Sequence, residues 1–412
     1  MEIMAKDIVD VCDLNLDGDF EWQVVNIMES VRLTRSEVEH LEKLFSDLEQ
    51  TLREYWPGCI VMPFGSIVTG LGIKTSDADC YVYLPEYLKS PGECYVMTAK
   101  HVLKRKPRIF QQLFAITAAR VPILKFFHVP TQCECDVNFN SLSGVRNSKL
   151  IAYLIHMDKR ALQFAILIKY WSKVHKLTGT NLVPNYALIM MAIFYLQQFN
   201  ILPAVSVLQQ DIDPEIVDNW DTSYNETYRH RTNNNQQLYS LLGGFFEYYS
   251  TYQYKDNIIC PYTGYSINRN LFKSLNLVPI DFKLYKDNLV GHKCKMLQIN
   301  SPMCVQDAFE HSRNTTMAVH PKLFHRFLFH LKHAADRFKQ CGKSDFLQAI
   351  LDPRNGPQMP LYINPKPQTR NVPNRPNRVT KQKNRNNMRN FNLHAAYTET
   401  NRMRQNARRH RF

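Results

Sequence analysis

The sequence predicts an α+β fold with two lobes, and three observations support this prediction. Four short β-like runs lie between residues 56 and 146, which predicts a small α/β unit there. Helical spacing of apolar residues dominates residues 1–55 and 147–350, which predicts a mainly helical second lobe. The chain has 412 residues, 44% of them hydrophobic, so it can supply two cores with a cleft between them as a natural ligand site.

The first predicted elements run from a long helix into the α/β unit. The helix covers residues 25–55, where Thr34 and Glu37 have the spacing of a capping box. A strand at residues 59–62 ends at Pro63. The remaining elements of the unit are a strand at 80–84, helices at 98–103 and 109–118, and strands at 121–129 and 133–139.

Beyond the α/β unit the sequence predicts helices and then a tail. Helical patterns cover residues 148–199, with a break at 178–184, and return at 238–249 and 324–338. Pro, Asn and Arg then recur with few large apolar residues. Because that composition cannot build a packed core, residues 351–412 are predicted to be a disordered basic tail.

Charge and cysteine usage limit the class of protein. The net charge is +14, but residues 364–412 hold thirteen Lys/Arg and one acid, Glu399, so this tail carries +12 (13 − 1) and the rest about +2 (14 − 12). No window approaches the length of an apolar membrane span, and no secretory signal is recognisable. Ten scattered cysteines predict a reduced, intracellular protein, which we expect in the cytoplasm, with the nucleus as an alternative.

The segment from Phe64 to Asp79 carries the strongest chemical signal. Gly65 allows the backbone to approach a ligand closely, and Ser66 can start a helix whose free N–H groups attract a triphosphate. Asp77 and Asp79 are two residues apart at the start of a strand, so both carboxylates are expected on one face. Paired carboxylates suit Mg²⁺, or Mn²⁺, which also bind substrate phosphates.

A second metal ion needs a third carboxylate. The β-like run at 133–139 offers Asp136 or Glu134, and spacing alone does not choose between them because both lie on one face. Two ions about 4 Å apart would activate an attacking hydroxyl and stabilise a leaving pyrophosphate. In-line phosphoryl transfer needs little further chemistry from the protein.

These residues together resemble the signature of the polymerase-beta-like nucleotidyltransferases. Within that superfamily, residues 25–340 resemble the non-canonical poly(A) polymerases and terminal uridylyltransferases. The resemblance implies a catalytic domain with a mixed sheet and a helical PAP-associated domain, to which residues 241–249 are similar. It also selects Asp136, in the run Asp-Val-Asn-Phe-Asn, as the third metal ligand.

The resemblance further implies a set of nucleotide-binding residues. Asn147 falls where the family binds the ribose, and Ser148 follows it. Lys169 and Lys173 fall on the pair that grips the triphosphate. Their i,i+4 spacing independently places both ammonium groups on one side of a helix. Asn185 and Tyr186 stand where the family commonly has Ser-Tyr, with the tyrosine stacking on the base.

Residues 307–314, which contain Asp307 and Glu310, resemble the loop with which the family reads the base of the nucleotide. Many uridylyltransferases place a His before the Asn of this loop, whereas here Arg313 occupies that position and His311 is displaced by two residues. An Arg donates to uracil O4 and disfavours adenine, whose amino group is also a donor. The sequence therefore favours UTP, as in Tailor-type uridylyltransferases, with ATP and a poly(A) polymerase as the alternative.

The implied partners are an RNA 3′ end and a nucleoside triphosphate. We expect a monomer that does not bind membranes and that chooses its targets through the cleft, the tail or a protein partner. Lys104, Arg105, Lys106 and Arg108 could line the RNA entry or could simply be a solvated helix end. The tail could bind RNA without reading sequence, and residues 381–389 could instead be a nuclear localisation signal. A catalytically inactive RNA-binding scaffold is the remaining alternative.

Overall fold

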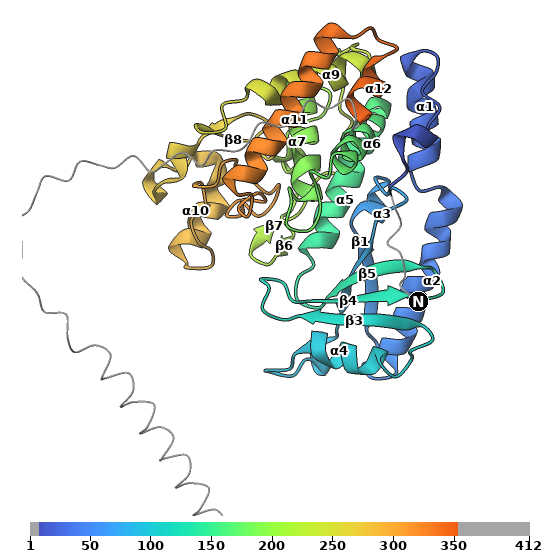
Figure 1. The fold of residues 1–412 in the computed structure, drawn as a ribbon. Helices are drawn as coiled ribbons and strands as arrows, with labels where there is room; N and C mark the ends of the chain where they lie inside the picture. The colour runs from blue at the N-terminus through green and yellow to red at the C-terminus, as the bar shows by residue number, and fades with distance from the viewer. Residues whose placement is uncertain (1–7, 353–412) are drawn as a thin grey trace, which may run out of the picture. The chain divides into compact units, whose positions relative to one another are not determined.

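The computed structural model describes residues 8–352, and almost all of the predicted tail therefore lies outside the described residues. Figure 1 shows a sheet-containing lobe beside a lobe built mainly from helices, which confirms the predicted α+β fold. None of the described helices is both long enough and apolar enough to cross a bilayer.

A five-stranded mixed sheet forms the core of the first lobe. Its order is β1-β2-β5-β4-β3, with β2 and β5 parallel and the other neighbours antiparallel. The strands are β1 (Ile60–Phe64), β2 (Ala78–Tyr83), β3 (Phe110–Ile116), β4 (Ile123–His128) and β5 (Cys133–Asn138). Alternate residues of β2 and β5, such as Cys80 and Val137, face the buried core.

The prediction of one helix over residues 25–55 is wrong, because the chain breaks between α1 (Phe20–Val31) and α2 (Arg35–Arg53). The predicted capping box at the start of α2 is confirmed. The Glu37 N–H donates to the Thr34 hydroxyl, and the Thr34 N–H donates to the Glu37 carboxylate. The leucines of α2 pack in the sheet core, as does α4 (Tyr95–Leu103), whereas α1 packs in the helical core. Residues 1–55 therefore do not all belong to the helical lobe, as the sequence suggested.

The predicted helix at residues 109–118 is also wrong, since this segment is the edge strand β3. Its pairing with β4 contains a bulge between Gln111 and Phe114, where Gln112 has a left-handed φ of 53°. The extra residue interrupts the alternation of side chains along the strand. Apolar residues then recur three or four apart, which imitates the spacing of a helix.

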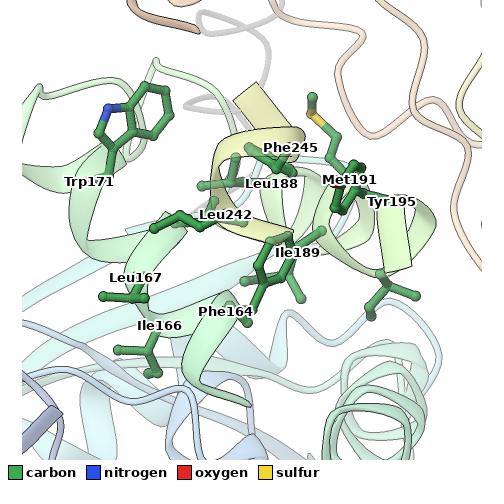
Figure 2. Close-up of a cluster of buried hydrophobic side chains, with 14 of the residues drawn as sticks. Phe164, Ile166, Leu167, Trp171, Leu188, Ile189, Met191, Tyr195, Leu242 and Phe245 are labelled. Atoms are coloured by element: carbon green, nitrogen blue, oxygen red, sulfur yellow. The ribbon is translucent and has the colours of Figure 1, made fainter. Parts of the chain in front are cut away.

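The second lobe is built around two helices that are buried on nearly all sides. Residues 187–196 are all buried in α7, and most of α6 is buried beside it. Figure 2 shows part of this cluster, with labelled side chains from α6, α7 and α9. Phe164 of α6 stacks on Tyr195 of α7, and Trp171 of α6 contacts Phe246 of α9. The longer helices are α5 (Ser143–His156), α6 (Lys159–Val174), α7 (Asn185–Gln198), α9 (Leu238–Thr251), α10 (Lys283–Val290) and α11 (Pro321–Gln340).

Short elements complete the lobe and support the loop after residue 300. A separate small core around Trp220, Phe272 and Tyr285 contacts that loop, since Trp220 packs against His311. The short helices are α8 (Val205–Leu208), α12 (Phe346–Leu351) and the 3₁₀ turns η1 (Val11–Asp13), η2 (Glu86–Leu88), η3 (Arg269–Phe272), η4 (Leu275–Leu277) and η5 (Ile280–Phe282). The short strands are β6 (Ile216–Val217), β7 (Trp220–Asp221), β8 (Asn257–Ile258) and β9 (Ile267–Asn268).

Candidate active site

A cavity of about 380 Å³ lies where the sheet lobe meets α5, α6 and α7. It collects all of the predicted site residues except Asp136, Asp307 and Glu310. The predicted residues that line it are Gly65, Ser66, Asp77, Asp79, Asn147, Ser148, Lys169, Lys173, Asn185, Tyr186 and Arg313. Residues far apart in the sequence thus converge on one chamber of the size expected for a ligand site.

Strand register places the carboxylates side by side. Asp79 of β2 is the direct partner of Asp136 of β5, so their side chains project from the same face. Asp77 immediately precedes β2 and lines the cavity. Glu134 points to the same face as Asp136, is exposed, and pairs with Phe127 of β4. The register therefore sets Asp136, and not Glu134, directly beside Asp79.

The local electrostatics favour a cation among these acids. Burial, followed by repulsion from Asp136 and Asp77, raises the pKa of Asp79 to about 7. Burial and the charges of Glu134 and Asp136 also raise the pKa of Asp77. Each carboxylate is thus destabilised in its charged form unless a proton or another cation neutralises it.

Lys125, which the sequence did not indicate, contacts the predicted acids through Asp136. It lies opposite Asp136 in β4, and its Nζ donates to both carboxylate oxygens at 2.6 and 2.5 Å. Burial opposes this charge, but the hydrogen bond and the charge of Asp136 raise the pKa of Lys125. The available signal was a single Lys within the run at 121–129, whose other residues are apolar except His128. Within residues 8–352, no three His, Cys, Asp or Glu side chains are already gathered tightly enough to hold a metal ion.

Gly65 brings the backbone against Asp79. Its φ is +81°, and a Cβ at this position would overlap Oδ2 of Asp79. The Gly65 N–H donates to Oγ of Ser148 at 2.8 Å, and that hydroxyl donates to the Gly144 carbonyl at 2.8 Å. Ser148 therefore holds the turn. Ser66 is the first residue of α3 (Ser66–Thr69), a helix of only one turn, rather than its cap.

The two predicted lysines differ in their surroundings. Lys169 is buried, and its Nζ donates to the Leu71 carbonyl at 2.8 Å and to Oγ of Ser76 at 3.1 Å. Burial, and then repulsion from Lys173, lowers the pKa of Lys169 to about 7. Lys169 thereby ties the loop before Asp77 to α6. Lys173 is partly exposed on the cavity wall.

Polar and aromatic groups at the helix ends complete the wall. Oδ1 of Asn147 and Oδ1 of Asn185 are buried and accept no hydrogen bond from any described residue. Such orphaned acceptors are costly unless a ligand or water donates to them. Tyr186 presents its ring to the cavity, while burial, and then the nearby Asp307, raise the pKa of its hydroxyl well above the ordinary value.

The loop after residue 306 closes the cavity beside Asn147. The Asp307 N–H donates to the Arg313 carbonyl at 3.0 Å, and Nη1 of Arg313 lies 3.6 Å from Oδ2 of Asp307. Asn147 Nδ2 donates to that same oxygen at 3.4 Å. Asp307 and Glu310 line a small adjoining cavity with Asn147 and Arg313, rather than the main chamber.

Other predicted residues lie away from the chamber. Glu310 pairs with Arg120, which lies in the β3–β4 turn and so bridges the two lobes. His311 is buried against Tyr262, with ring centroids 4.1 Å apart, and burial lowers its pKa to about 3. It is thus a core residue. The basic cluster at 104–108 follows α4 and does not line the main cavity in the described structure.

Two protein-family models match the chain. Residues 20–156 match the central palm domain of the mitochondrial-like poly(A) RNA polymerases, and residues 237–313 match the Cid1-family poly(A) polymerase domain. The chain belongs to the non-canonical poly(A) polymerase and terminal uridylyltransferase family. The first match begins at α1 and contains the whole sheet, and the second contains α9 and Arg313.

Individual relatives carry both adenylyl and uridylyl names. The chain is 24% identical over 404 residues to a speckle targeted PIP5K1A-regulated poly(A) polymerase of Xenopus tropicalis, covering 81% of this chain and 45% of that one. It is 29% identical over 189 residues to terminal uridylyltransferase 7 of Homo sapiens, covering 44% of this chain and 13% of that one. The chain thus spans less than half the length of either relative.

Solved structures share the fold at low sequence identity. A mitochondrial poly(A) polymerase in complex with UTP superposes with a TM-score of 0.70 at 20% identity, covering 84% of this chain and 76% of that one. A mutant of the Cid1 poly(U) polymerase bound to MgATP gives a TM-score of 0.66 at 19% identity, covering 81% and 98%. These likenesses confirm the two-lobed architecture.

Proposed function

We propose that this protein transfers nucleotides, without a template, from a nucleoside triphosphate to the 3′-OH of RNA, and that UTP is its preferred donor. One observation carries the proposal: strand register sets Asp79 directly beside Asp136, and Asp77 joins Asp79 on the wall of a chamber that two lysines also line. Family membership supports nucleotidyl transfer on RNA.

The acids fit a pair of divalent cations, Mg²⁺ or Mn²⁺. The raised pKa values of Asp77 and Asp79 mean that a cation would relieve their crowding. Asp77, Asp79 and Asp136 are the residues that would hold the metal. When bound, it would supply charge neutralisation at the hydroxyl and the leaving pyrophosphate. Because Lys125 already neutralises Asp136, metal binding there requires Lys125 to share or release that carboxylate.

The remaining wall residues fit the parts of a nucleotide. Lys173 and Lys169 offer cations for the triphosphate, with Ser66 at the turn next to Asp79. The orphaned Oδ1 of Asn147 can accept a hydrogen bond from a ribose hydroxyl. The Tyr186 ring, with its hydroxyl turned away into the protein, offers an apolar face for the base.

Arg313 supports UTP as the donor. Its guanidinium is partly exposed on the chamber wall and is held near Asp307. Guanidinium groups only donate hydrogen bonds, which suits the O4 acceptor of uracil and opposes the N6 amino donor of adenine. ATP is the second candidate, because several relatives bear the name poly(A) polymerase.

A four-nucleotide extension assay tests the proposal. The protein is incubated with a 5′-labelled single-stranded RNA, Mg²⁺ and each nucleoside triphosphate separately. UTP should give the highest kcat/KM, and Arg313→Ala should reduce the ratio of UTP to ATP use by about tenfold. Faster extension with ATP would refute the donor assignment. No extension with any of the four nucleotides would refute the transfer itself.

A further inference from the structure

One continuous row of side chains crosses all five strands on the catalytic face. The strand registers pair Phe64 with Asp79, Asp79 with Asp136, Asp136 with Lys125 and Lys125 with Phe114. Directly paired residues project from the same face of a sheet. The row of acids that the proposed function uses therefore ends, at the free edge of the sheet, in an aromatic ring.

Phe114 occupies this place because of the bulge in β3. The register moves from Gln111 opposite Phe127 to Phe114 opposite Lys125, which inserts one extra residue on the β3 side. Without it, Leu113 would lie opposite Lys125 and Phe114 would face the opposite side of the sheet. Gln112 absorbs the extra residue with a φ of 53°, a conformation that disfavours residues other than glycine. The fold thus accepts local strain to direct Phe114 to the catalytic face.

The ring is solvent-accessible although a phenylalanine in a sheet usually packs. Phe114 is 61% exposed, while its neighbours Leu113 and Ala115 pack against the sheet core. Ile116 and Ile123 form the next pair on the same face and are half-buried. The edge of the catalytic face therefore offers an exposed aromatic ring with two half-buried isoleucines beside it.

The charges around the ring fit a nucleic acid strand. Lys125, whose Nζ also bonds Asp136, lies beside Phe114. Arg120 lies in the turn that joins β3 to β4, and it keeps 67% of its side chain exposed although it pairs with Glu310. Beyond Lys125 the row becomes acidic at Asp136, which repels phosphate. Aromatic rings next to cations are the recurring way to bind single-stranded nucleic acid without reading its sequence.

We propose that Phe114 is a stacking platform for a base at the 3′ end of the acceptor RNA, with Lys125 and Arg120 next to the adjoining phosphates. This inference rests on the proposed function and adds a site for the acceptor strand. Phe114 is two strand spacings, about 10 Å, from Asp136, so it binds a base near the reacting hydroxyl rather than the hydroxyl itself. The platform lies on the far side of the acids from the chamber that takes the triphosphate.

Phe114→Ala and Phe114→Tyr in the full chain test the platform. Phe114→Ala should raise KM for RNA about tenfold, with KM for the nucleotide and kcat unchanged, because one stacked base is lost. Phe114→Tyr keeps the ring and should restore wild-type KM. Tyr87→Ala is the matched control, since Tyr87 is 77% exposed in the same lobe but lies in η2, outside the row.

Direct binding of a fluorescent single-stranded RNA separates this inference from the proposed function. The tenfold loss on Phe114→Ala should persist at higher salt, because stacking, unlike phosphate contact, releases no counterions. An unchanged RNA affinity for Phe114→Ala would overturn the platform even in a protein that transfers nucleotides. A change in oligomeric state with unchanged RNA affinity would also overturn it and would identify this edge as a protein interface. If the wild type transfers no nucleotide, the proposed function fails, and the RNA affinities still decide the platform.

Discussion

Replacing Gly65 by Ala tests whether the close approach of this turn to Asp79 matters for the chemistry. The φ of +81° and ψ of −158° lie in a region that only glycine enters readily, which costs about 1–3 kcal/mol for alanine. The new Cβ would also lie 3.2 Å from Cγ of Asp79 and would overlap its Oδ2. Asp79 is held in β2, so its carboxylate must shift. A misplacement of about 1 Å at a reacting centre can cost about a hundredfold in rate.

Gly92→Ala is the matched control for this substitution. Gly92 has a φ of +80°, but a Cβ there meets nothing within 4 Å. Both variants should lower the thermal midpoint, whereas only Gly65→Ala should lower kcat for RNA extension, by about a hundredfold. Wild-type turnover in Gly65→Ala would refute the role of this contact. An equal loss of turnover in Gly92→Ala would show that backbone strain, and not the position of Asp79, limits the rate.

Two buried charges of the site and the cap of α2 also give measurable effects. Burial and the neighbouring carboxylates raise the pKa of Asp79 to about 7 from 3.8, so its protonated form stabilises the native state below about pH 4 and that stabilisation is lost as the pH rises through 7. Asp79→Asn should therefore have a higher thermal midpoint than the wild type in the absence of divalent metal, and the difference should be larger at about pH 8 than at about pH 5. A difference that does not change with pH would contradict this prediction. Lys169→Met should raise KM for the nucleotide by about tenfold but leave KM for RNA unchanged, since Lys169 is a buried cation on the chamber wall. The exposed Lys159→Met on the same helix should change neither constant. Thr34→Ala should destabilise the protein by about 1 kcal/mol through the lost cap of α2, seen as a lower thermal midpoint with unchanged nucleotide kinetics.

The sequence singled out acids and lysines that the fold brings together, because the motifs that contain them are local. Asp77 and Asp79 lie within one short segment, and Lys169 and Lys173 lie on one helix. The choice between Asp136 and Glu134 needed either a family resemblance or the register of β2 against β5, which no single strand encodes. Long-range register is fixed by the packing of the whole sheet.

The errors also have physical causes. The bulge at Gln112 shifts the apolar residues of β3 to helix-like spacing, so periodicity indicated the wrong element. The apolar residues of α2 recur at helical spacing, which shows that one face of the helix is buried but not which lobe buries it. The sequence therefore assigned α2 to the wrong lobe. Lys125 of β4 pairs with Asp136 of the neighbouring strand β5, a contact that local sequence does not show.

We propose that the carboxylates of Asp79 and Asp136, side by side on β2 and β5, drive nucleotide transfer to RNA. This role is tested by measuring nucleotide incorporated and pyrophosphate released by the wild type and by the double variant Asp79→Asn, Asp136→Asn, using RNA, UTP and Mg²⁺. The wild type should release one pyrophosphate for each nucleotide added, and the double variant, still folded by thermal midpoint, should do neither. Equal incorporation by the wild type and the double variant would show that these carboxylates do not act in the transfer.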